Sequence, residues 1–112
     1  MPNLIGPSNN TPTPMLQRLN VSQGVSRGLL MKQVQPVYPP NALRLHIEGP
    51  VQLLATLSKS GDISDVKILS GDKQLAQSAL VAVKQWKYKP YLLNGEPVEI
   101  QTQITVNFKL PH

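Results

Sequence analysis

The sequence offers few side chains of the kinds that carry acid–base or metal chemistry. It has no cysteine and two histidines, His46 and His112, which are widely separated along the chain. Its six acidic residues fall mostly in predicted turns, so neither paired carboxylates nor a nucleophile with its own base can be recognised. We therefore expect no catalytic residues, no bound metal and no cofactor, and we predict that the chain is not an enzyme.

A cluster of lysines and aromatic residues suggests a different chemistry, the binding of a nucleic acid. Lys84, Lys87 and Lys89 surround Trp86 and Tyr88, and such a cluster could stack on and clamp a single strand. Lysines near the end of a helix also interact favourably with its dipole. The net charge of +5 does not favour nucleic acid, because the chain beyond residue 34 holds eight bases and six acids. We favour the structural interpretation and expect no nucleic-acid partner.

The length of 112 residues is enough for one domain. Prolines are frequent at the start, so we expect residues 1–22 to be a proline-rich linker. Residues 23–34 fit either a linker or a short strand at Leu29–Val34, and residues 35–112 are expected to fold. The longest apolar run, Ala79–Val83, is too short to cross a bilayer. No secretion signal opens the chain, so a role outside the cytoplasm would need a longer parent protein.

Prolines and apolar spacing predict the first elements of the folded part. Gln35–Pro40 must be extended, because a proline moves the residue before it out of the helical region. A short helix is expected at Pro39–His46, since proline is tolerated in the first turn. In this helix, Ala42 and either Leu43 or Leu45 are expected to face inward.

A hairpin is predicted next. Val51–Ser58 alternates apolar and polar residues, which is typical of a half-buried strand. Lys59–Asp62 has turn residues, and Ile63–Leu69 resumes the character of a strand. The apolar phase slips by one residue within this second strand, which predicts a bulge near Asp65.

The last third of the chain predicts a helix and a long strand. Asp72 can cap a helix whose apolar residues recur at helical spacing as far as Lys87, and Pro90 ends it. Asn94-Gly95 predicts a tight turn. Val98–Lys109 then alternates apolar and polar residues more regularly than any other segment.

The connections limit how the three predicted strands pair. The hairpin makes the first two antiparallel, and the helix lets the second and third run parallel, so the third can pair antiparallel with the first. We predict an α+β fold with a three-stranded antiparallel sheet, in the order second, first, third, and two helices on one face. The last strand is then a thinly protected edge, where another strand can be added.

An ordered series of short motifs spans residues 35–110. It comprises Gln35-Pro36-Val37-Tyr38-Pro39, Ile47-Glu48-Gly49, Ser60-Gly61-Asp62-Ile63, Trp86-Lys87-Tyr88 with Pro90, and Asn94-Gly95. In these motifs and their order the chain resembles the C-terminal domain of the TonB family, the energy transducers of Gram-negative envelopes. The resemblance implies a periplasmic domain that a proline-rich linker tethers to an inner-membrane helix outside this sequence. That helix couples to the ExbB and ExbD motor.

The resemblance also implies a partner and a way of binding it. Members of the family bind the TonB box of outer-membrane transporters by strand addition and drive nutrient uptake. The last strand and the region of the Tyr-Pro pair are then the expected contacts: Gln35, Pro36, Tyr38, Ile100, Thr102, Ile104, Thr105, Val106, Asn107, Phe108 and Lys109. Tyr38 and Trp86 are also expected to pack as core aromatics.

Two other outcomes stay open. The same fold and edge would serve a periplasmic regulatory, peptidoglycan-contacting or protein-interaction module that energises no transporter. The edge would also pair with a second copy of the chain, which would give a homodimer through Val98–Lys109 in competition with the partner.

Overall fold

Two nine-residue strands, β3 (Gly49–Leu57) and β8 (Ile100–Phe108), form the centre of the protein. In the computed structural model, which describes residues 19–110, they pair antiparallel without interruption from Gly49 opposite Phe108 to Leu57 opposite Ile100. The predicted alternation is confirmed, because every second side chain of β8 is buried: Ile100, Thr102, Ile104, Val106 and Phe108. The apolar ones face the core together with the buried apolar residues of β3.

The predicted hairpin joins β3 to β4 (Ile63–Ser70). Thr56 lies opposite Asp65, whereas the next residue, Leu57, lies opposite Ile63, so Ser64 is an extra residue on β4. This register shift confirms the bulge predicted near Asp65. A second shift follows between Gln52 and Leu53, so β4 is irregular at both ends.

The principal helix, α3 (Lys73–Val83), begins where the sequence predicted. The Asp72 carboxylate caps it by accepting from the backbone N–H groups of Gln74 at 2.8 Å and Leu75 at 3.1 Å. Its buried side chains pack on the sheet: Leu75, Ala76, Ala79, Ala82 and Val83. It is the longest helix of residues 19–110, and no helix in that part has the length and hydropathy to cross a membrane.

The predicted continuation of this helix to Lys87 is wrong. The chain leaves the helix after Val83, and Lys87–Tyr88 forms β5, which pairs antiparallel with β2 (Leu30–Lys32). The Trp86 indole Nε1–H donates to the Val34 carbonyl at 2.9 Å. Pairing of β5 with a segment more than 50 residues earlier therefore outweighs the helical spacing of the apolar residues. The same pairing makes Leu30–Lys32, a part of residues 29–34, a strand.

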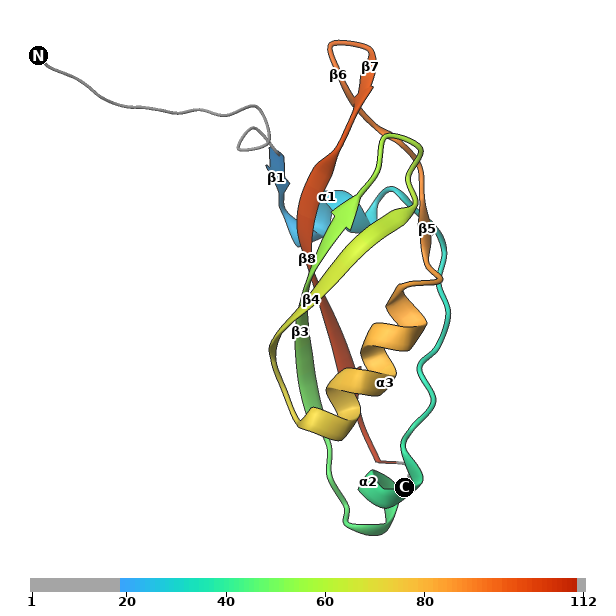
Figure 1. Cartoon of the computed structure of the whole chain (residues 1–112), viewed down its shortest axis with the longest axis vertical. Helices are drawn as coiled ribbons and strands as arrows, with labels where there is room; N and C mark the ends of the chain where they lie inside the picture. Colours follow the sequence, from blue (N-terminus) through green and yellow to red (C-terminus); the bar gives the residue numbers. More distant parts are fainter. Residues whose placement is uncertain (1–18, 111–112) are drawn as a thin grey trace, which may run out of the picture.

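The short helix and the tight turn form as predicted. α2 spans Pro40–Arg44 and buries Ala42, but Leu43 and Leu45 are both exposed, so the expectation that one of them faces inward is wrong. A helix of five residues turns only one side chain inward here. At the other end of the molecule, β6 (Tyr91–Leu93) and β7 (Glu96–Val98) form a projecting hairpin through Asn94-Gly95, both at positive φ (Figure 1).

The predicted three-stranded sheet is wrong, because a further strand joins it. A fourth strand, β1 (Leu19–Val21), pairs parallel with β8, so the sheet order is β1-β8-β3-β4 (Figure 1). The helix α1 (Gln23–Arg27) follows and adds a third helix to the two predicted. Residues 19–22 are thus not linker, because Leu19 and Val21 pack against the core. The rest of the predicted linker, residues 1–18, lies outside the described residues.

The turn between β3 and β4 packs tightly on β5, which yields a stability prediction. Gly61 has a φ of +90°, and a Cβ there would lie 1.9 Å from the Tyr88 carbonyl oxygen. We predict that Gly61→Ala lowers the free energy of unfolding by more than about 2 kcal/mol, through strain and this clash. Gly95→Ala is the control, since its φ is +82° but its Cβ would meet nothing within 4 Å. Urea denaturation should show a loss of only about 1 to 2 kcal/mol for this variant; equal losses would contradict the packing argument.

The buried ring of Tyr88 yields a pH prediction. Burial raises the pKa of Tyr88 to about 12, although the Arg27 charge acts in the opposite direction. The folded state therefore favours the neutral phenol. The resulting stability is complete below the unfolded pKa of about 10 and is lost as the pH rises through 12.

We predict that the free energy of unfolding of the unmodified chain falls between pH 10 and 12. The free energy of unfolding of Tyr88→Phe should fall less steeply over this window. Urea denaturation at several pH values measures both slopes. If the Tyr88→Phe slope equals that of the unmodified chain, the raised pKa of Tyr88 is not a property of the fold.

Candidate functional site

The outer edge of β8 is only partly covered. Leu19–Val21 pairs with Ile100–Thr102, and among residues 19–110 no strand pairs with the outer side of Gln103–Phe108. We call Gln103–Phe108 the open edge. The expectation of an edge that is open along the whole last strand is wrong for Ile100 and Thr102, because β1 occupies that part.

Side-chain hydrogen bonds hold β1 and α1 beside β8. The Thr102 hydroxyl donates to the Val21 carbonyl at 2.8 Å and lies 2.9 Å from the Ser26 hydroxyl, which itself donates to the Gln23 carbonyl at 3.1 Å. The Gln23 side-chain amide donates to the Thr105 hydroxyl at 3.1 Å. This last bond places the start of α1 where the open edge begins.

The predicted site residues on β8 divide between the two faces of the sheet. Val106 and Phe108 are buried in the core, so they offer a partner only backbone groups, whereas the Ile104 side chain, which is also buried, lines a pocket at the edge of the strand. Thr105 and Asn107 alternate with them and therefore point to the opposite face. Lys109 follows the strand and is exposed.

A polar row on this second face orients the side chains near the edge. The Gln52 side-chain oxygen accepts from the Gln103 amide at 2.6 Å and from the Thr105 hydroxyl at 2.8 Å. The Thr105 hydroxyl hydrogen is thus used in the bond to Gln52. Thr105 can then only accept from Gln23, so Gln23 must present its NH₂ group. Its other side-chain atom, Oε1, is buried and has no hydrogen-bond partner.

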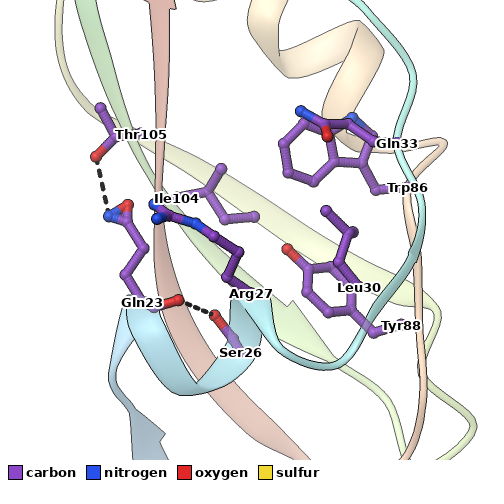
Figure 2. Close-up of a pocket in the computed structure, with 9 residues that line it drawn as sticks. All are labelled: Gln23, Ser26, Arg27, Leu30, Gln33, Trp86, Tyr88, Ile104 and Thr105. Atoms are coloured by element: carbon purple, nitrogen blue, oxygen red, sulfur yellow. Dashed lines mark hydrogen bonds between the residues drawn. The ribbon is translucent and has the colours of Figure 1, made fainter.

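A pocket of about 200 Å³ lies at the start of the open edge (Figure 2). Because Ile104 and Thr105 point to opposite faces, a pocket that both line must lie at the outer edge of β8. Its positive charge comes from Arg27, and no acidic residue lines it. The complete lining is Gln23, Ser26, Arg27, Leu30, Gln33, Trp86, Tyr88, Ile104 and Thr105.

The region of the Tyr-Pro pair lies largely elsewhere. Gln35 is exposed and lines a separate hollow of about 320 Å³ on α3, which Val37 and Ser78 share. The Ser78 hydroxyl donates to the Val37 carbonyl and holds this segment on the helix. Gln33 is thus the glutamine that shares a pocket with Thr105, whereas Pro36, which follows Gln35, is half-buried and lines neither hollow.

Tyr38 has a structural role, as the sequence suggested. Its ring packs edge-on against Phe108, with ring centres 5.4 Å apart, and its hydroxyl donates to the Ile47 carbonyl at 2.5 Å. Burial, with a smaller contribution from the Glu48 charge, raises the pKa of Tyr38. Tyr38 therefore supports the far end of the open edge from the core side.

The lysine and aromatic cluster is explained by packing. Trp86 is 6% exposed and Tyr88 3%, so neither ring is free to stack on a base. Lys87 forms an ion pair with Asp62, and its hydrogen bond, with that of Ser60, lowers the pKa of Asp62. No group of three or more metal-binding side chains occurs among residues 19–110.

Sequence reasoning missed five residues of the pocket: Gln23, Ser26, Arg27, Leu30 and Gln33. All five fall in the 23–34 segment, whose assignment stayed open between linker and strand. The weak local signal was the Ser22 cap of α1, which accepts from the Val25 N–H at 3.2 Å. That signal predicts a helix start but says nothing about its position beside β8.

Comparison with known sequences gives a consistent picture. The family model for the C-terminal region of Gram-negative bacterial TonB proteins matches residues 34–110. Protein TonB of Vibrio cholerae is 43% identical over 84 residues, which are 73% of this chain and 34% of that protein. Protein TonB of Xanthomonas campestris is 30% identical over 77 residues, which are 67% and 34% of the two chains. The chain thus spans about a third of the length of these relatives.

Solved structures agree. The solution structure of the Pseudomonas aeruginosa TonB C-terminal domain has a TM-score of 0.63 and 27% identity, and the match covers 74% of this chain and 86% of that one. The TonB2 protein from Vibrio anguillarum has a TM-score of 0.57 and 31% identity, with 75% and 82% covered. The motifs, the fold and the matched range lead to one conclusion: the chain belongs to the TonB C-terminal domain family.

Proposed function

We propose that this domain binds the TonB box of outer-membrane transporters as a strand added to the open edge, Gln103–Phe108. Its parent protein would be anchored in the inner membrane, reach into the periplasm and transmit force from the ExbB and ExbD motor to drive nutrient uptake. Family membership supports energy transduction in general. The observation that supports this binding mode is the unpaired outer side of β8.

The open edge suits strand addition better than the opposite edge of the sheet does. β4 forms the other edge, but its pairing with β3 contains two register shifts. Such bulges bend a strand and discourage pairing with another chain. β8 pairs in one unbroken register, so its outer N–H and C=O groups keep regular spacing.

Main-chain pairing also fits a role in pulling. An added strand is bound through backbone hydrogen bonds, so the contact tolerates different side chains. This tolerance suits one transducer that serves several receptors. Force along the strand axis loads these hydrogen bonds together. The central β3–β8 pairing has nine residue pairs, runs beside the whole open edge and would carry the load into the core.

A peptide test distinguishes main-chain pairing from other modes. In an added strand, alternate N–H groups face β8. We predict that a TonB-box peptide N-methylated at the inward-facing positions no longer binds, whereas methylation of the other set leaves the affinity within about twofold, because those groups face away. Amide chemical-shift titration of the labelled chain gives both affinities and shows whether the shifts concentrate at Gln103–Phe108.

The control is the unmethylated peptide at the same concentrations. Equal losses for the two methylated peptides, or shifts centred on β4, would contradict strand addition to β8. A titration without peptide, over protein concentration, shows whether a second copy occupies the same edge. No binding of any TonB-box peptide by the folded monomer would favour the regulatory or cell-wall module.

The family resemblance gives Gln35 a separate role that can be tested. We predict that Gln35→Ala weakens TonB-box binding a few-fold, through the loss of a polar contact beside the Tyr-Pro pair. The loss should be smaller than that caused by methylation of the inward-facing peptide amides. Gln85→Ala is the matched control, since Gln85 lines the same hollow. If Gln35→Ala loses as much affinity as methylation of the inward-facing amides does, the main contact with the peptide lies in this region and not at the open edge.

A further inference from the structure

The pocket at the start of the open edge contains a cation without a partner. The Arg27 guanidinium lines it, and no carboxylate of residues 19–110 forms an ion pair with Arg27. Figure 2 shows the Tyr88 hydroxyl pointing toward the Arg27 side chain, and the Arg27 charge acts on that phenol. A positive charge therefore faces a pocket whose walls are otherwise amide, hydroxyl and apolar groups.

The same pocket contains a buried acceptor without a donor. Gln23 Oε1 has no hydrogen-bond partner, and the polar row fixes the orientation of the amide, because Thr105 donates to Gln52 and must accept from Gln23. Buried polar atoms in folded proteins are almost always paired. An unpaired acceptor beside an unpaired strand edge is what a backbone N–H of an added strand would satisfy.

The size and position of the pocket fit one side chain. Its volume is about 200 Å³, and a cavity of roughly 150 Å³ accepts a group the size of benzene. Leu30 and Ile104 provide apolar walls for a methylene stem, while Arg27 provides a counter-ion for its end. A strand that passes Thr105 on the outer side of β8 passes the mouth of this pocket.

We propose that this pocket is a specificity subsite that accepts the carboxylate of one Asp or Glu side chain from the added strand. Arg27 pairs with the carboxylate, and Gln23 Oε1 accepts a backbone N–H of the same strand. The proposal rests on the strand addition proposed above and goes further, because it names the side-chain chemistry that the edge selects.

A peptide scan tests the subsite. The probe is a six-residue peptide of alternating Thr and Val with blocked ends, in which Glu or Gln is placed at each position in turn. Trp86 is the single tryptophan of the chain and lines the pocket, so its emission reports binding. We expect one position at which Glu binds about tenfold more tightly than Gln, as a hydrogen-bonded charge pair would give.

Three variants of the full chain complete the test. Arg27→Gln should abolish the preference for Glu, because it weakens the Glu peptide about tenfold and the Gln peptide much less, whereas Arg27→Lys should keep part of the preference. Lys84→Gln removes the same charge from an exposed site at the end of α3 and should keep the whole preference. Gln23→Met should weaken the Glu and Gln peptides equally, because it removes the acceptor for the backbone.

The outcomes separate the two proposals. Binding of the peptides without a preference for Glu, or a preference that survives Arg27→Gln, overturns the subsite and leaves strand addition standing. No binding of any peptide, with unshifted amides at Gln103–Phe108, overturns both. Free acetate at the same concentrations should not change the Trp86 emission; if it does, the pocket is a site for small anions and the subsite proposal is wrong.

Discussion

The uninterrupted pairing of β3 with β8 is the interaction on which the rest of the structure depends. Side chains alternate along both strands, so a slip of one residue would turn the apolar set of β8 to water and the polar set to the core. The buried face thus fixes the register from Gly49 opposite Phe108 to Leu57 opposite Ile100. The register in turn aligns Gln52 with Gln103 and Thr105, and this polar row orients Gln23.

The N-terminal segment divides the edge of β8 into two parts. β1 covers Ile100–Thr102, and Gln23 of α1 donates a hydrogen bond to Thr105, which lies within the open edge. The open edge of six residues spans about 20 Å at the usual rise of a strand. The elements that shorten the edge also bring Arg27 and the unpaired Gln23 oxygen to its start. Length and chemistry of the binding surface thus have the same structural origin.

Much of the fold could be predicted because its signals are local. Alternation predicted β3 and β8, a phase slip predicted the bulge near Asp65, and Asp72 marked the start of α3. The errors concern pairing between distant segments. β1 has three residues and β5 has two, which is too short for a periodic pattern, and each is a strand only because a partner more than 50 residues away lies beside it.

The candidate site likewise combines features that the sequence predicts with features that only contacts between distant segments create. The sequence by itself determined which side chains of the last strand face the core, that this strand carries an exposed polar face, and which family the motifs resemble. Only the tertiary structure decided that Gln23 meets Thr105, 82 residues away, and that Gln33 rather than Gln35 shares their pocket. Periodicity is a property of neighbouring residues, whereas a pocket is made where separate segments pack, and no local pattern records that contact.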